Sequence, residues 1–322
     1  MKLFKNALFW LIVLVTAIFA LAPYLGDNIT LRETLVLSAI YIILAANLNL
    51  MIGYTGYVNF GSIVFFGLGG YLTLWLVTDH GFNVFLAVLI AGLVTSALAF
   101  ALGIGILRLR GAYFALATIG VNEAVKDFVS NFDTWGGSEG IFMPFTAFKS
   151  LGGAGKALWT IYFLIIAVMG LSLLLSLWVK RSKFGLGLFA IREDEDAAVV
   201  LGVKAPLFKS LAYSLSAFLP AIAGGLYFFK NGSVVPEEAF NLNLSIEAIV
   251  MVMLGGQGTV SGPAIGAFLY ERLRGMLLTI PGLSNFHMVI AGVLLLLIIL
   301  FAPGGLMGWL YRIWPRLRRV LE

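Results

Sequence analysis

Long apolar runs separated by short polar segments make up most of this 322-residue chain. A helix of about 20 residues crosses a hydrocarbon core of ~30 Å, and the runs reach this length without the alternation that marks a membrane barrel. Because lipid offers no water to free backbone groups, such runs fold as helices. Only 11% of the residues are charged, against about 25% in soluble domains. The sequence therefore predicts an all-α, polytopic membrane helical bundle.

The apolar runs predict about ten spans in a single transmembrane domain that covers residues 1–322. We interpret the first run as a retained anchor and not as a cleaved signal peptide, since Pro23 disfavours cleavage. The runs at 112–130 and 244–256 are the weakest and are candidates for broken or re-entrant helices. The expected spans are 1–25, 34–52, 59–78, 83–107, 112–130, 157–179, 209–229, 244–256, 263–281 and 286–302.

Basic residues are unevenly distributed between the two sides of this topology. Of the 21 lysines and arginines, 14 fall on the side that carries both termini and residues 180–208. Loops rich in Lys and Arg stay in the cytoplasm. We therefore expect both termini and this loop to be cytoplasmic, and we attribute the net charge of +5 to this bias and not to a nucleic-acid partner.

The most distinctive polar segment lies at about residues 184–205. Its four acidic residues directly precede a helix-forming Ala-Ala pair, where negative charge complements the positive end of a helix dipole, and Gly202 offers a stop. Ile191, Ala198 and Leu201 are expected to share one face. We expect this segment to dock onto a partner protein and couple it to the bundle; the alternative is an ordinary solvated loop helix. The residues with an expected coupling role are Arg192, Glu193, Asp194, Glu195, Asp196, Ala197, Ala198 and Gly202.

Two glycine-rich segments, 53–56 and 255–263, interrupt apolar runs at similar points in the two halves of the chain. Interrupted helices survive in a membrane where the freed backbone is buried in protein or lines a watery cavity. The alternative is tight turns and close helix packing by small residues. The candidate substrate-path residues here are Gly56, Asn59, Ser62, Gly256 and Gln257.

Polar residues within the expected spans add further candidates, because such groups are costly in hydrocarbon and are functional by default. Asn47, Asn49 and Glu123 are therefore also candidates for the path. Charged neighbours three residues apart can instead neutralise each other on one helix. This alternative pairs Glu123 with Lys126 and Glu271 with Arg274.

The sequence offers no apparatus for catalysis or for holding a metal. The chain has no cysteine and only two histidines, which excludes thiolate chemistry and a histidine-based metal cluster. No Gly-Lys-Ser/Thr follows the glycine-rich stretches, so no Walker A loop is present. We therefore expect this chain to bind no cofactor and to catalyse no reaction.

Six short motifs occur in order along the chain: Gly53–Gly61, Leu107–Ala115, Trp135–Gly140, Ala190–Ala198, Leu254–Gly258 and Phe301–Leu306. Together they resemble the motifs of the M-type permease subunit of bacterial branched-chain amino acid ABC importers. The resemblance covers about residues 30–306 and includes an acidic-Ala-Ala-x-x-x-Gly pattern at Asp196–Gly202. Two departures are Asp196 in place of the usual Glu, and the absence of a hydrophobic-x-Leu-Pro ending at 212–215.

The resemblance implies a multi-pass permease of the bacterial inner membrane that moves leucine, isoleucine and valine into the cytoplasm. It implies four kinds of partner: a paralogous H-type permease, two cytoplasmic ATP-binding subunits, an extracytoplasmic substrate-binding protein and membrane lipid. ATP and Mg²⁺ would be used by the ATP-binding subunits, into which a short helix of the 184–205 segment would dock. The alternatives are an ABC permease for urea or short amides and a stand-alone, ion-coupled secondary transporter.

Overall fold

A computed structural model describes residues 7–25, 29–279, 289–290, 292–293, 296–297, 300 and 304–314. The chain is almost entirely helical, as the sequence predicts. The helices are α1 (Ala7–Leu21), α2 (Ile29–Thr55), α3 (Ile63–Thr78), α4 (Val84–Ile106), α5 (Ala112–Ser130), α6 (Ala154–Arg181), α7 (Lys183–Glu193), α8 (Glu195–Val200), α9 (Ala205–Asn231), α10 (Pro236–Ala239), α11 (Leu242–Gly255), α12 (Gly262–Thr279) and α14 (Gly305–Ile313).

Six described segments are long and apolar enough to cross a membrane: 7–24, 29–55, 84–106, 154–181, 205–231 and 236–255. The polytopic helical class is therefore confirmed. Helices α3, α5 and α12 match three further expected spans in position, but α3 has 16 residues and is only about 24 Å long at 1.5 Å per residue. Most of the expected span 286–302 lies outside the described residues.

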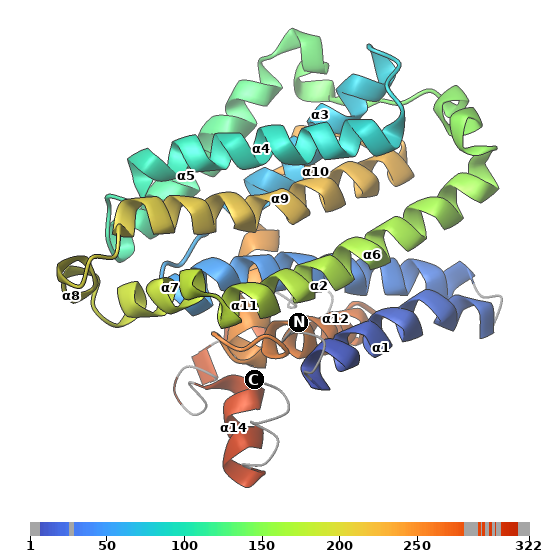
Figure 1. The fold of residues 1–322 in the computed structure, drawn as a ribbon. Coiled ribbons are helices and arrows are strands. Elements are labelled where there is room, and N and C mark those ends of the chain that lie inside the picture. Colours follow the sequence, from blue (N-terminus) through green and yellow to red (C-terminus); the bar gives the residue numbers. More distant parts are fainter. Residues whose placement is uncertain are drawn as a thin grey trace.

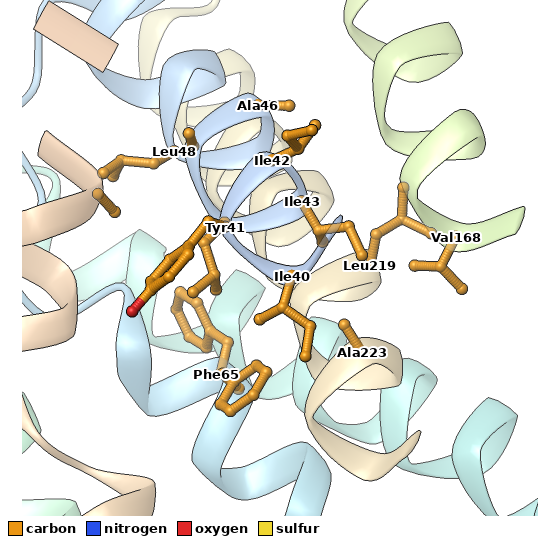
Figure 2. Close-up of a cluster of buried hydrophobic side chains, with 14 of the residues drawn as sticks. Ile40, Tyr41, Ile42, Ile43, Ala46, Leu48, Phe65, Val168, Leu219 and Ala223 are labelled. Carbon is orange, nitrogen blue, oxygen red and sulfur yellow. The ribbon is translucent and has the colours of Figure 1, made fainter. Parts of the chain in front are cut away.

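Helix α2 is the centre of the bundle. Protein buries 94% of its apolar window, against 17% for α1, and its hydrophobic residues point in all directions, as expected for a helix surrounded by other helices. Figure 2 shows side chains of α2 between Phe65 of α3, Val168 of α6 and Leu219 of α9. Helices α4, α9, α6 and α2 run side by side (Figure 1).

Glycines allow α3 and α9 to touch backbone to backbone. A Cβ atom added at Gly224 of α9 would lie 1.9 Å from the carbonyl oxygen of Phe66, and one added at Gly69 of α3 would lie 1.9 Å from that of Ala221. Small residues permit such close approach between membrane helices, whose association depends on packing. The α3–α9 contact therefore requires both glycines.

Short elements cover one end of the bundle. They are the 3-10 helices η1 (Ala22–Leu25), η2 (Asp133–Trp135), η3 (Gly137–Glu139) and η4 (Phe145–Leu151) and the strands β1 (Ile141–Phe142) and β2 (Ser233–Val234). The strands pair antiparallel, with Ile141 opposite Val234. Helices α7 and α8 lie at the opposite end, beyond α4 and α9, on the left in Figure 1. We call this the α8 end.

Candidate functional site

The acidic segment forms two helices and not one. Helix α7 ends at Glu193, and the side chain of Asp194 caps α8 by accepting a hydrogen bond from the Ala197 N–H at 3.0 Å. Asp is a favoured N-cap residue because its oxygen satisfies a free helix N–H. Glu195 and Asp196 occupy the first turn of α8, where the sequence predicts acidic charge. Glu193 belongs to the last turn of α7, which is a difference from that expectation.

The end of α8 confirms one expectation and corrects another. Gly202 has φ +92°, a conformation that suits glycine after a helix. Ile191 and Ala198 are buried, but Leu201 is 83% exposed. The expected shared face of these three residues is therefore wrong for Leu201, because the chain leaves the helix after Val200 and turns the leucine outward.

Glu195 reaches from α8 into the bundle, where it meets the buried ammonium group of Lys209. Its Oε1 accepts from Lys209 Nζ at 2.7 Å, and its Oε2 accepts from the hydroxyl of Tyr57 at 2.8 Å. Lys209 Nζ also donates to Tyr57 Oη at 3.0 Å and to the Leu107 carbonyl oxygen at 2.7 Å. Burial raises the pKa of Tyr57, and the hydrogen bond to Glu195 raises it further. The hydroxyl therefore remains a donor to the carboxylate at neutral pH.

Asp196 faces water and pairs with Arg110, which follows the end of α4. The guanidinium donates to both carboxylate oxygens, at 2.8 and 3.2 Å. The hydrogen bond and the charge of Arg110 hold the pKa of Asp196 below its ordinary value. Both side chains are mostly exposed, and exposed pairs contribute little to stability.

Arg192 joins α7 to the first glycine break, by which we mean the segment from Gly53 to Ser62 where α2 ends and α3 begins. Its Nη1 donates to the Gly53 carbonyl oxygen at 2.6 Å. A Cβ atom added at Gly53 would lie 2.5 Å from the Gly258 nitrogen, and one added at Gly258 would lie 3.1 Å from Arg192 Nη1. The two breaks therefore touch each other beside Arg192, an arrangement that their sequence positions did not predict.

Asn49 fastens the second break to α2. Its amide Nδ2 donates to the Thr259 carbonyl oxygen at 2.9 Å, and its Oδ1 accepts from the Gly258 N–H at 2.9 Å. Asn49 is fully buried. Backbone groups are thus hydrogen-bonded to both polar atoms of the Asn49 amide. This supports a structural role in addition to the role in the substrate path that the sequence predicts.

Both breaks interrupt their helices as predicted. After α2 the chain passes through Gly56 at φ +77°; the buried Asn59 accepts from the Gly61 N–H at 3.0 Å, and Ser62 Oγ lies 3.2 Å from Ser245 Oγ of α11. After α11 the chain passes through Gly256 at φ +120°. Gln257 is partly exposed there.

The remaining path candidates lie apart from each other. Asn47 is buried in α2 and donates to Ser172 Oγ at 2.9 Å and to the Ile43 carbonyl oxygen at 2.8 Å. Glu123 is exposed on α5, next to the buried Asn122, whose Nδ2 donates to the Phe240 carbonyl oxygen at 3.0 Å. The structure therefore does not bring Asn47 and Glu123 together.

Charged residues of the spans pair both along one helix and between helices: Glu271 lies 3.6 Å from its neighbour Arg272, whereas Arg274 pairs across helices. Arg274 of α12 lies 3.4 Å from the buried Glu247 of α11 and donates to the hydroxyl of Tyr41 at 2.9 Å. The expected Glu271–Arg274 pairing is therefore replaced, because the α11 carboxylate is a neighbour in space. Glu271 accepts instead from Ser38 Oγ at 3.0 Å.

The expected Glu123–Lys126 pair is likewise replaced, since Lys126 lies 2.9 Å from Glu237 of α10. The Glu247–Arg274 pair was missed. The signal that could have found it is that each residue lies within an apolar run and needs an opposite charge nearby.

A cavity of about 410–430 Å³ is found in each of two places. One is almost wholly apolar and lies between α1 and α12. The other opens at the α8 end, beneath the first break, and its lining includes Gly56, Tyr57, Arg110 and Arg192. In the described part of the chain, no group of three or more His, Asp or Glu side chains is placed to hold a metal ion.

The described helices thus form a polytopic bundle in which two helix breaks touch and a short charged helix is held beside one of them. The comparisons identify the family. The chain belongs to the family of the branched-chain amino acid transport system permease component, whose profile matches residues 30–299.

Its relatives include permeases named for different substrates. The high-affinity branched-chain amino acid transport system permease protein LivM of Escherichia coli K12 is 28% identical over 94% of this chain and 75% of its own length. LivM of Salmonella typhimurium is 29% identical over 84% of this chain and 68% of its own. The ribose import permease protein RbsC of Bacillus subtilis is 31% identical over 43% of this chain and 46% of its own. No solved structure matches the chain significantly.

Proposed function

We propose that this chain is the permease subunit of an ABC importer that moves branched-chain amino acids into the cytoplasm as a single transmembrane domain. It would act with a second, paralogous permease, two ATP-binding subunits and an extracytoplasmic binding protein, and the ATP-binding subunits would use ATP and Mg²⁺. The relatives named for branched-chain amino acids cover most of the chain, whereas RbsC covers less than half. This difference favours an amino acid over a sugar as the substrate.

One observation carries the proposal: the outer side of α8 and the turn after it is apolar and exposed. Val199, Val200 and Leu201 are 51%, 86% and 83% exposed, although they lie at the end of the bundle and next to charged groups. Contiguous apolar surface rimmed by polar residues marks an interaction site. The inner side of α8 is anchored by Glu195. This helix therefore has one side for the bundle and one side for a partner, which we assign to the ATP-binding subunit.

The cavity beneath the first break is proposed as the inner end of the substrate path. It lies beside Gly56 and opens at the α8 end, which we propose is cytoplasmic because basic residues are concentrated on that side. The second break, which includes Gly256 and Gln257, contacts the first through Gly53 and Gly258. These residues remain the path candidates that the geometry supports best.

Cysteine labelling tests the orientation, and the absence of native cysteines makes it direct. Lys183→Cys places a thiol at the exposed start of α7, and Phe145→Cys places one at the opposite end, where Phe145 is 85% exposed. In intact cells we expect an impermeant maleimide added outside to label position 145 and to label position 183 only after the membrane is opened. Labelling of position 183 from outside would reverse the orientation.

Aspartate substitution on the exposed face of α8 tests partner docking. Val200→Asp and Leu201→Asp should each lower the amount of ATP-binding subunit that co-purifies with the chain, because a carboxylate replaces a buried apolar contact worth about 2 kcal/mol, or roughly 30-fold in affinity. Phe145→Asp is the matched control at the opposite end. Full retention in both α8 variants would refute docking through this surface.

Uptake into vesicles that hold the assembled complex distinguishes the remaining alternatives. We expect ATP-dependent uptake of L-leucine, with urea and ribose transported at background rates. Leucine uptake by the purified chain alone, driven by an ion gradient, would instead support a secondary transporter.

A further inference from the structure

A single ammonium group connects four elements at the α8 end. Lys209 belongs to α9, is 2% exposed, and donates to Glu195 of α8, to Tyr57 of the first break and to the Leu107 carbonyl oxygen at the end of α4. An ammonium group has three hydrogens. Each of them therefore has an acceptor, and each acceptor comes from a different element.

Tyr57 closes this connection into a ring. Its hydroxyl accepts from Lys209 and donates to Glu195 Oε2 at 2.8 Å, while Lys209 Nζ lies 4.8 Å from the centre of the Tyr57 ring. The backbone at Tyr57 lies between the end of α2 at Thr55 and the start of α3 at Ile63. The hydroxyl is thus the direct link between α8 and the segment that interrupts the two helices.

We propose that Tyr57, Lys209 and Glu195 form a relay through which a displacement of α8 moves the break between α2 and α3. The proposal rests on the function proposed above, because the displacement would come from the ATP-binding subunit docked on α8. All three act in the relay as positioning residues. Tyr57 also lines the cavity proposed as the inner end of the path, but the relay uses only its hydroxyl, which is bonded to Lys209 and Glu195.

The hydrogen-bonded set of Tyr57, Lys209 and Glu195 transmits motion because it is buried, whereas the Arg110–Asp196 ion pair at the surface does not. Glu195 also lies 3.7 Å from Arg110, but the Lys209 ammonium group is almost fully buried. Separating it from Glu195 would leave that charge uncompensated away from water, so the two move together. The Arg110–Asp196 pair is exposed on both sides, and water can replace either partner at little cost. Motion of α8 therefore passes through the buried ring.

The relay continues from the first break to the second. Gly53, in the last turn of α2, accepts from Arg192 Nη1 at 2.6 Å and lies against Gly258. Asn49, one turn earlier, holds Gly258 and Thr259 through both ends of its amide. A shift of the chain around Tyr57 therefore reaches both breaks through the end of α2.

Tyr57→Phe tests the relay with the smallest change, since it removes only the hydroxyl and keeps the aromatic side chain and the Lys209–Glu195 ion pair. The matched control is Tyr54→Phe, three residues earlier, which removes a buried hydroxyl that donates at 3.2 Å to the Ser176 carbonyl oxygen of α6 and not to α8. Each variant is purified with its ATP-binding subunits and reconstituted in lipid. The measured quantity is the ratio of ATP hydrolysis with and without leucine-loaded binding protein.

The relay predicts that Tyr57→Phe keeps its ATP-binding subunits but lowers the stimulation ratio about 5-fold or more, the lower end of typical coupling factors. Lys209→Met should lower it further, and Tyr54→Phe should retain the wild-type ratio. A wild-type ratio in Tyr57→Phe, or an equal fall in Tyr54→Phe, would overturn the relay. Failure of the wild-type chain to retain ATP-binding subunits would instead overturn the proposed function.

Discussion

Gly224→Ala is expected to destabilise the bundle strongly. The new methyl carbon would lie 1.9 Å from the Phe66 carbonyl oxygen, and a backbone atom cannot rotate away as a flexible side chain can. Helices α3 and α9 must then separate, at a cost of about 1–3 kcal/mol or more, as in overpacked interiors. The measurement is the thermal midpoint of the purified chain in detergent, together with its abundance in the membrane.

Gly120→Ala provides the control, because Gly120 lies in helix α5 with no neighbouring atom within 4 Å of an added Cβ. Alanine is the better helix former, so this variant should be neutral or slightly more stable. Gly69→Ala should resemble Gly224→Ala. When the two are combined, the second should cost less than the first, since one separation of the helices relieves both clashes. Wild-type stability in Gly224→Ala would contradict the observed contact.

Arg274→Leu is expected to remove most of the protein from the membrane. Its loss would leave the carboxylate of Glu247, 1% exposed, without the nearby guanidinium. Arg274 itself is 30% exposed, but Glu247 is buried. Leaving a buried charge without its partner costs up to about 3–5 kcal/mol, whereas replacing both residues by apolar ones is often neutral. We therefore expect Glu247→Leu/Arg274→Leu to recover the abundance that Arg274→Leu loses.

Arg272→Leu is the matched control, two residues earlier on α12. Arg272 is 40% exposed and lies 3.6 Å from Glu271, which also has the hydrogen bond from Ser38. Its loss should change stability by less than about 1 kcal/mol. Leucine uptake by the double variant then separates two roles: full recovery assigns the pair to structure, and recovery of abundance alone assigns it to the substrate path. Equal abundance of wild type and Arg274→Leu would refute the expected cost.

Much of the helical layout follows from local pattern. The run at 112–130 coincides with α5, and the glycines at 56 and 256 mark both interruptions. Apolar length, small residues and positive φ act within a few positions along the chain, so the sequence reveals them. The capping oxygen of Asp194 is also a local signal. It could have predicted the division between α7 and α8.

Pairing between distant segments could not be predicted in this way. The sequence offers Glu271 as a neighbour for Arg274, but Glu247 lies on another helix and meets it only in the folded bundle. Lys209 likewise gives no sign of its partners, because its three acceptors come from residues 57, 107 and 195. Asn49 shows the same limit: its polarity is evident, but its two backbone partners depend on tertiary packing.

The burial of α2 on all sides has a consequence for evolution. Most substitutions along this helix must be accommodated by neighbouring helices, because protein buries 94% of its apolar window and its side chains lie beside those of α3, α6 and α9 (Figure 2). The outward-facing residues of α4, such as Leu93 at 56% exposure, are less constrained by neighbours within this chain. Divergence among family members should therefore accumulate on the outer helices and proceed slowly along α2. The rate of change at each position would then trace the centre of the bundle from sequences alone.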